Sequence, residues 1–170
     1  MFKGSYSVTI TPTSNDGKIK VKSLEKYFNW QIKKRIGGLI ILGSTGEFLS
    51  ISDNNRLKMI KESSSIIDKR VPLFVGTAAE NTYEAIRYSV EAQAQNADGV
   101  MIIPPFYSTP TPEELINHFK MISKEIDIPI MVYNNPATSN IDITPEIFAE
   151  LSKIKNVEYC KESTMDVTRV

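Results

Sequence analysis

Short apolar runs recur along the chain with little polar interruption. From the second run onward they start 34, 27, 30 and 27 residues apart, about the length of a strand, a helix and their loops. Runs that do not alternate between apolar and polar residues are typical of strands buried on both faces of a parallel sheet. We predict strands over Ser7–Thr11, Leu39–Leu42, Leu73–Val75, Val100–Ile103, Ile130–Val132 and Val157–Cys160.

Helix start signals lie between these runs. The clearest is Thr111–Glu114, a capping box with proline at the first helical position. Asn81 and Thr144 open the neighbouring helices in a similar way. Strand and helix therefore alternate, which fits either a doubly wound sheet or a (β/α)8 barrel. Neither the glycine fingerprint of a dinucleotide-binding sheet nor a P-loop is present, so other motifs must separate the two folds.

Composition narrows the class of protein. Twenty basic and twenty acidic residues cancel, which argues against the broad basic surface of a nucleic-acid binder. The one cysteine, Cys160, excludes an internal disulfide, and the one histidine, His118, leaves no cluster at zinc spacing. No apolar run approaches the roughly 18 residues that span a bilayer. We expect a soluble, unprocessed cytoplasmic protein without nucleic-acid or membrane partners.

Two strand ends and one turn carry candidate chemistry. The turn Gly43–Glu47 offers close backbone approach and the hydroxyls of Ser44 and Thr45 to a small anion such as a carboxylate, although a simple capped turn explains the same residues. Tyr133 ends the fifth predicted strand and could equally be a packing residue. Lys161 follows the sixth strand, where loss of hydration favours the uncharged, nucleophilic amine; a surface lysine is the alternative.

These positions also carry a family resemblance. Gly38–Glu47 resembles, position for position, the first signature of the dihydrodipicolinate synthase / N-acetylneuraminate lyase family. The second signature, a tyrosine motif followed by a lysine that forms a Schiff base, is approximated by Tyr133–Pro136 and Lys161–Ser163. Pro104–Tyr107 matches as well, and the resemblance covers essentially all 170 residues.

The resemblance implies a (β/α)8 TIM barrel of which residues 1–170 would be a partial catalytic domain, with about six βα units and without strands seven and eight or the C-terminal helical region. Open edges at strands one and six would then make the isolated chain prone to aggregation or low activity.

The resemblance also implies a class I lyase or aldolase. Lys161 would form a Schiff base with pyruvate or another 2-oxo acid, and a C–C bond to an aldehyde would be made or broken. Tyr133 would act as general acid and base, while Ser44 and Thr45 would bind the substrate carboxylate and relay protons towards Tyr107. No metal or organic cofactor would be required. Because Tyr107 is often supplied across a subunit interface in the family, a homo-oligomer, dimer or tetramer, is implied.

Two departures from the family pattern bear on the substrate. Thr138 stands where the lysine-biosynthetic branch typically has an arginine that can bind a carboxylate with two hydrogen bonds. Tyr159 replaces a small residue on the same strand face as Lys161. We therefore favour a lyase or aldolase acting on another 2-oxo acid, with 4-hydroxy-tetrahydrodipicolinate synthase and a truncated, non-catalytic 2-oxo-acid-binding protein as alternatives.

Three further side chains receive structural predictions. His118 should face solvent from the middle of its helix, and Trp30 should pack the first helix against the barrel wall. Cys160 should point away from the face of Lys161 into the layer between strand and helix, where it would be buried.

Overall fold

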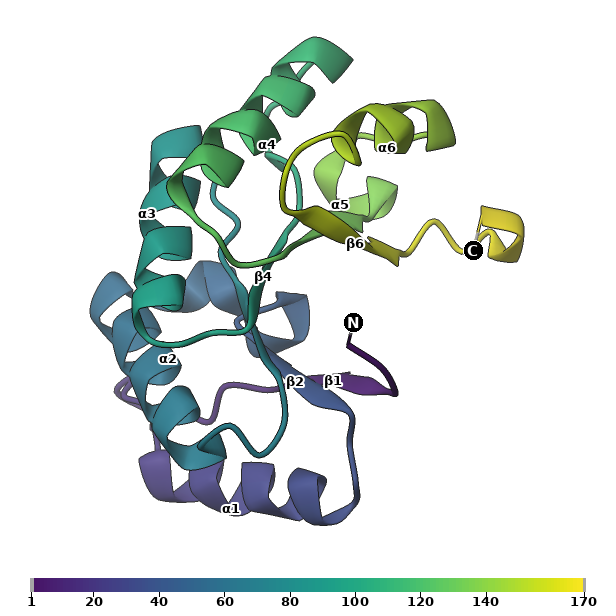
Figure 1. The fold of residues 1–170 in the computed structure, drawn as a ribbon. Helices are drawn as coiled ribbons and strands as arrows, with labels where there is room; N and C mark the ends of the chain where they lie inside the picture. Colours follow the sequence, from purple (N-terminus) through teal and green to yellow (C-terminus); the bar gives the residue numbers. More distant parts are fainter. Residues whose placement is uncertain (1, 170) are drawn as a thin grey trace. The chain divides into compact units, whose positions relative to one another are not determined.

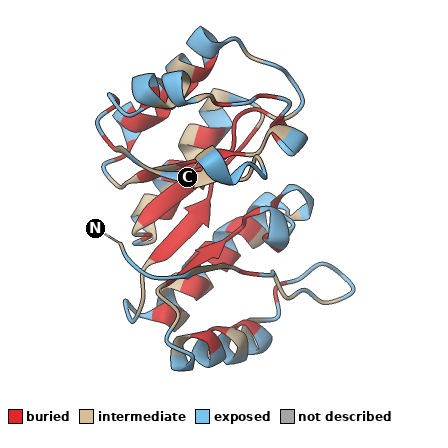
Figure 2. Cartoon of the chain, turned by 90° about the vertical axis from the view of Figure 1, so that its right-hand side faces the viewer, coloured by how far each residue is buried: buried red, intermediate tan, exposed pale blue. Residues whose placement is uncertain are grey.

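The computed structural model describes residues 2–169, which form two compact units. The first consists of Met1–Gly76 and Ala94–Asp98, and the second of Thr77–Gln93 and Gly99–Val170. Each unit contains parallel strands and helices in alternation (Figure 1). In Figure 2 the strands are coloured largely as buried, whereas exposed residues gather on the helices and loops.

The first unit is built on three parallel strands that follow chain order, with Leu39 in register with Leu73. Every residue of its second and third strands is buried, as their unbroken apolar sequence predicts. Its elements are β1 (Tyr6–Val8), α1 (Val21–Lys33), β2 (Gly38–Ile41), the 3-10 helices η1 (Ser44–Gly46) and η2 (Phe48–Ser50), α2 (Asp53–Ile67) and β3 (Leu73–Gly76).

The second unit also has three parallel strands in chain order, with a register shift between Ile130 and Met131. Beyond that shift Tyr133 is in register with Lys161. Its elements are α3 (Thr82–Ala94, whose last residue falls in the first unit), β4 (Gly99–Ile102), α4 (Pro112–Glu125), β5 (Ile130–Asn134), α5 (Pro136–Ser139), α6 (Pro145–Leu151), β6 (Val157–Glu162) and the 3-10 helix η3 (Val167–Arg169).

Helix α4 confirms the capping prediction. The Thr111 hydroxyl accepts a hydrogen bond from the Glu114 amide at 3.3 Å, and the Glu114 carboxylate accepts one from the Thr111 amide at 2.8 Å. These contacts satisfy backbone donors that the first helical turn leaves unpaired. Leu115, Phe119 and Ile122 are fully buried on the inner face of the helix. Apolar spacing therefore correctly identifies the side of α4 that packs on the sheet.

The first strand is shorter than predicted. It ends at Val8, although the sequence predicts a strand over Ser7–Thr11. Thr9 still donates its amide to the Ile40 carbonyl at 2.9 Å, but Thr11 instead donates its hydroxyl to the Gly46 carbonyl at 2.7 Å. The last residues of the predicted strand thus support a turn rather than extending the sheet.

Two predictions about the burial of helix side chains are wrong. Trp30 is 56% exposed and stacks on Tyr27 with ring centroids 6.3 Å apart, because the buried face of α1 carries Leu24 and Phe28 instead. His118 is only 4% exposed, because it lies three residues after Leu115 on the inward face of α4. Its Nδ1 lies 2.9 Å from the Thr82 hydroxyl. None of the described helices has the length and apolar character needed to cross a membrane.

Candidate active site

The turn after β2 is held in a strained backbone conformation. Leu42, which is 1% exposed, has φ 55°, and Glu47 has φ 56°, so non-glycine residues in the left-handed region flank the turn on both sides. Such residues cost about 1–3 kcal/mol each and persist only where the surroundings enforce them. The turn also approaches β3 closely at Gly76, where an added Cβ would lie 2.0 Å from the Leu42 carbonyl oxygen, so that position has room only for glycine.

Packing beneath the turn leaves its hydroxyls outside. Gly46 is buried, and a Cβ there would lie 3.1 Å from the Thr9 carbonyl oxygen and 3.2 Å from the Thr11 hydroxyl. Ser44 and Thr45, in contrast, are exposed. The first unit therefore presents the two hydroxyls on a fixed backbone, an arrangement suited to binding a small anion.

Arg56 is a supporting residue of this turn that sequence reasoning missed. Its side chain is 4% exposed, and its guanidinium donates to the carbonyl of Gly76 at 3.3 Å and to that of Phe48 at 3.1 Å. Arginine in a polar helix reads as a surface residue, so only the three-dimensional contacts reveal that it ties the end of β3 to η2.

Lys161 and Tyr133 meet in the second unit. They are register partners on β6 and β5, and the Lys161 Nζ lies 3.2 Å from the centroid of the Tyr133 ring. Tyr133 is 7% exposed, while Lys161 is half-buried. A cation over an aromatic face is attracted by the electron-rich ring. The parallel pairing of β5 with β6 thus places the amine of Lys161 beside the phenol of Tyr133, at the strand ends where the sequence predicts them.

The phenol has further polar neighbours. Partial burial would raise the pKa of Tyr133, but hydrogen bonding and charge attraction from Lys161, with hydrogen bonds from Ser163 and Asn135, outweigh burial and lower the pKa overall. The Asn135 amide donates to the Tyr133 hydroxyl at 2.9 Å. A phenol whose ionised form is favoured in this way gives up its proton more readily, which suits it to general acid–base chemistry near neutral pH.

A buried asparagine fixes the ends of β5 and β6 beside this pair. The Asn134 side chain is fully buried; its amide nitrogen donates to the Glu162 carboxylate at 3.0 Å and to that of Asp142 at 3.1 Å. Its carbonyl oxygen accepts the Ile143 amide at 3.0 Å. Arg169 donates to Asp142 at 2.5 Å. Glu162, the neighbour of Lys161 in sequence, is therefore held in place from the adjacent strand.

Tyr107 lies on the loop after β4 and is 89% exposed. The structure thus brings two predicted residues together, Tyr133 with Lys161, and leaves the Tyr107 side chain open to solvent. Ser44 and Thr45 belong to the first unit.

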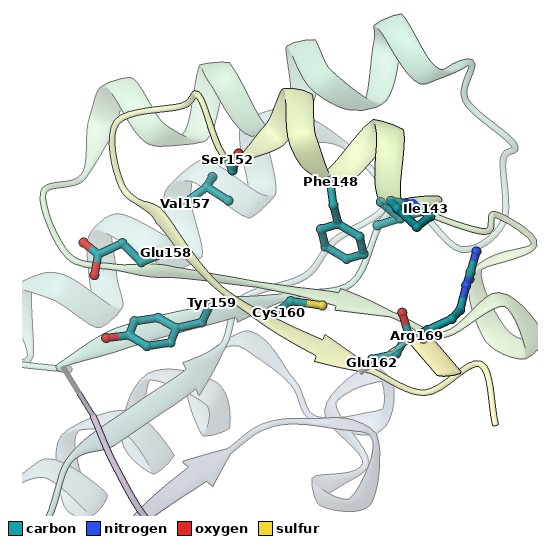
Figure 3. A pocket seen from close by; sticks show the side chains of 10 residues that line it. Ile143, Phe148, Ser152, Val157, Glu158, Tyr159, Cys160, Glu162 and Arg169 are labelled. Atoms are coloured by element: carbon teal, nitrogen blue, oxygen red, sulfur yellow. The ribbon is translucent and has the colours of Figure 1, made fainter. Parts of the chain in front are cut away.

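A cavity of about 400 Å³ lies elsewhere in the second unit, between α6 and β6 (Figure 3). Phe148 and Cys160 line it, whereas Lys161 and Tyr133 do not. Cys160 is on the helix side, as predicted, but is exposed rather than buried, because the cavity opens beside it. Partial loss of hydration at the thiol, with a smaller contribution from the Glu162 charge, raises the pKa of Cys160 to about 11, so this side chain is a poor nucleophile.

No group of three or more histidine, cysteine, aspartate or glutamate side chains within residues 2–169 is arranged to hold a metal ion.

Comparison with known proteins identifies the relatives of this chain. The sequence profile of the Dihydrodipicolinate synthetase family matches residues 1–170. The chain is 40% identical over 171 residues to the 4-hydroxy-tetrahydrodipicolinate synthase of Persephonella marina, covering 100% of this chain and 58% of that protein. This chain thus spans less than two thirds of the length of that relative.

Solved structures agree with the sequence comparison. The 4-hydroxy-tetrahydrodipicolinate synthase from Methylacidiphilum fumariolicum SolV superposes with a TM-score of 0.96 at 34% identity, covering 99% of this chain and 56% of that one. The chloride-inhibited dihydrodipicolinate synthase from Acinetobacter baumannii, complexed with pyruvate, gives a TM-score of 0.96 at 33% identity, with 99% and 58% covered. The fold of residues 2–169 is therefore that of an incomplete (β/α)8 barrel with six parallel strands, as predicted.

Proposed function

Because the chain belongs to the dihydrodipicolinate synthetase family, we propose that it is a lyase or aldolase in which Lys161 forms a Schiff base with pyruvate or a related 2-oxo acid. The observation that carries the proposal is the pairing of an amine and a phenol, with the Lys161 Nζ 3.2 Å from the Tyr133 ring centroid. Residues 1–170 then form part of a barrel catalytic domain.

The first step joins the lysine to the ketone. The Lys161 ammonium first gives up a proton, and the free amine then attacks the carbonyl carbon, whose oxygen takes up protons and leaves as water, which yields an imine. Loss of a proton from the neighbouring carbon gives an enamine, whose electron pair forms the new bond to an aldehyde carbon. Tyr133 accepts and returns protons in these steps, helped by the contacts that lower its pKa.

The turn of the first unit has a proposed role of its own. Ser44 and Thr45 are exposed hydroxyl residues on a rigid turn, and we assign them to the carboxylate of the same 2-oxo acid. Tyr107 relays protons; because its side chain is 89% exposed, it is available to complete the site of another copy in a homo-oligomer. A cytoplasmic location remains a prediction from the single cysteine.

Pyruvate is the favoured 2-oxo acid, because the relative from A. baumannii is known in complex with it. The identity of the aldehyde substrate depends on different observations. The names of relatives at 40% and 35% identity favour 4-hydroxy-tetrahydrodipicolinate synthase as a second candidate function. Against it stands Thr138, which is exposed on α5 and has no guanidinium to bind a carboxylate on the aldehyde.

Borohydride trapping tests the proposed function. The chain is incubated with pyruvate, reduced with borohydride and weighed by intact-protein mass spectrometry. We expect one reduced pyruvate per chain, none with Lys161→Ala, and a full adduct with Lys155→Ala, a control lysine paired with Asp127 on the surface. A folded wild-type chain that pyruvate stabilises without any adduct would favour a binding protein, and a folded chain with neither response contradicts the proposal.

A further inference from the structure

One carboxylate organises the loop that carries Tyr107. The Glu80 Oε2 accepts hydrogen bonds from the backbone amides of Phe106 and Tyr107, each at 3.0 Å. The Glu80 Oε1 accepts from the Ser108 amide at 2.8 Å and from the Ser108 hydroxyl at 2.6 Å. Three consecutive residues of the loop are thus tied to a single side chain.

Glu80 itself stands on a fixed part of the second unit. Its segment follows β3 in the chain and begins at Thr77, which is fully buried. The Thr77 amide donates to the Met101 carbonyl on β4 at 3.1 Å, and the Ser89 hydroxyl on α3 donates to the Thr77 hydroxyl at 2.8 Å. The carboxylate therefore links a rigid support to the exposed residues 107–109.

The loop has a second, weaker connection. The Asn140 amide nitrogen, just beyond α5, donates to the Phe106 carbonyl at 3.4 Å. That contact holds the loop at one point and at a long distance, whereas Glu80 holds three successive amides at 2.8–3.0 Å. Glu80 is consequently the main restraint on the backbone direction at Tyr107.

We propose that Glu80 is a positioning residue that sets the place of the Tyr107 phenol for proton transfer, an inference that rests on the proposed Schiff-base function. Misplacement of a reacting group by about 1 Å can slow a reaction up to about a hundredfold. The Tyr107 side chain is 89% exposed within this chain, so the backbone of its loop sets where the phenol is presented.

The position requires a carboxylate. All four contacts are made by donors in the loop, two to each oxygen, so both oxygens of Glu80 must accept. Glutamine would present an NH2 group to two of these donors. Partial burial would raise the pKa of Glu80, but the hydrogen bonds from Ser108, Tyr107 and Phe106 lower it on balance, so the group is ionised at neutral pH.

The experiment compares Glu80→Gln with Glu84→Gln, the same change in the first turn of α3 at a carboxylate paired with Arg87. Deuterium entry into the methyl group of pyruvate in D2O, followed by NMR, reports the proton transfers that convert imine to enamine. Borohydride trapping at Lys161 reports imine formation. Backbone hydrogen exchange of residues 106–108 reports the tether itself.

We expect Glu80→Gln to keep the borohydride adduct but to slow deuterium entry between about tenfold and a hundredfold, as Tyr107→Phe does. The double variant should be no slower than Tyr107→Phe alone, since both changes act through one phenol. Amide protection at residues 106–108 should fall, and Glu84→Gln should match the wild type throughout.

Deuterium entry at the wild-type rate in Glu80→Gln, or in Tyr107→Phe, overturns the positioning role. A wild-type chain that forms no adduct contradicts the proposed function instead. In that case unchanged amide protection at residues 106–108 in Glu80→Gln overturns the tether, and lost protection supports it.

Discussion

The Gly43–Glu47 turn and the Tyr133–Lys161 pair are constructed by different means. Backbone conformation defines the turn: Leu42 has φ 55°, and its carbonyl group occupies the space next to the Gly76 Cα where a side chain would otherwise lie. Side-chain hydrogen bonds and strand register position the pair: Asn134 links Glu162 to Asp142, and the parallel register places Lys161 beside Tyr133. Small residues are therefore essential in the first region, and satisfied polar groups in the second.

The largest expected effect lies in the turn. Gly76→Ala would place a methyl group 2.0 Å from the Leu42 carbonyl oxygen and 2.6 Å from its carbon, both of them backbone atoms that cannot move cheaply. Urea unfolding should show a loss of about 3 kcal/mol or more. Gly17→Ala is the control, since a Cβ there meets open space and only the positive φ of 79° opposes it, at about 1 kcal/mol. Equal losses at both positions would refute the role of steric contact at Gly76.

The next largest expected effect is a dependence of the unfolding free energy on pH, which arises in the second unit. Burial, opposed only in part by the Glu80 charge, lowers the pKa of His118 from 6.5 to about 4. The unfolded chain therefore binds a proton at this imidazole below about pH 6.5 that the folded chain takes up only below about pH 4, so stability falls as the pH is lowered through this window. At pH 4.5 the loss from this group is about 2–3 kcal/mol relative to pH 7.

Unfolding at the two pH values with His118→Gln isolates that contribution. The variant should lose about 2–3 kcal/mol less than the wild type between pH 7 and pH 4.5, because its amide does not titrate. Identical pH dependence in both proteins would mean that His118 is not buried in the neutral form.

The polar network should respond more moderately. Asn134→Leu leaves the Ile143 amide without its acceptor and removes one donor from each of the Glu162 and Asp142 carboxylates, at a cost of about 2 kcal/mol. Asn117→Leu on the exposed side of α4 serves as the control. In urea unfolding, a loss at Asn134 no greater than at Asn117 would show that the network does not stabilise the second unit.

The smallest effect is expected beneath the turn. Thr11→Val preserves shape but removes the hydrogen bond to the Gly46 carbonyl, which should cost about 1 kcal/mol in urea unfolding. The exposed Thr13→Val should be close to neutral. If the two variants are equally stable, steric packing alone holds the turn.

Local patterns in the sequence predict most of the fold. The six strands and the capping box of α4 follow from apolar runs and from Thr111–Glu114, because burial and helix capping depend on nearby residues. Errors arise for residues that could lie on either the buried or the exposed face of a helix. The buried side of α4 includes His118, and the buried side of α1 excludes Trp30, since hydrophobicity is a weaker guide than helical position for such residues.

The candidate site divides in the same way. Ser44, Thr45, Tyr133 and Lys161 are recognisable because each stands in a contiguous motif or directly at a strand end. Arg56 and Glu80 stand in no such motif, and the motif that contains Asn134 does not reveal its bonding role, because the partners of all three lie 8 to 28 residues away in sequence and are brought near only by folding. Supporting residues with distant partners leave no periodic signal.

We propose that Ser44 and Thr45 bind the carboxylate of the 2-oxo acid that Lys161 takes up. The direct measurement is the pyruvate concentration that gives half-maximal borohydride adduct at Lys161, in the wild type and in Thr45→Val and Ser44→Ala, with Thr13→Val as the control. We predict that both turn variants still form the adduct but need about tenfold more pyruvate, the equivalent of about 1.4 kcal/mol of lost carboxylate binding, while Thr13→Val is unchanged. Half-saturation at the wild-type concentration in both turn variants would contradict the claim.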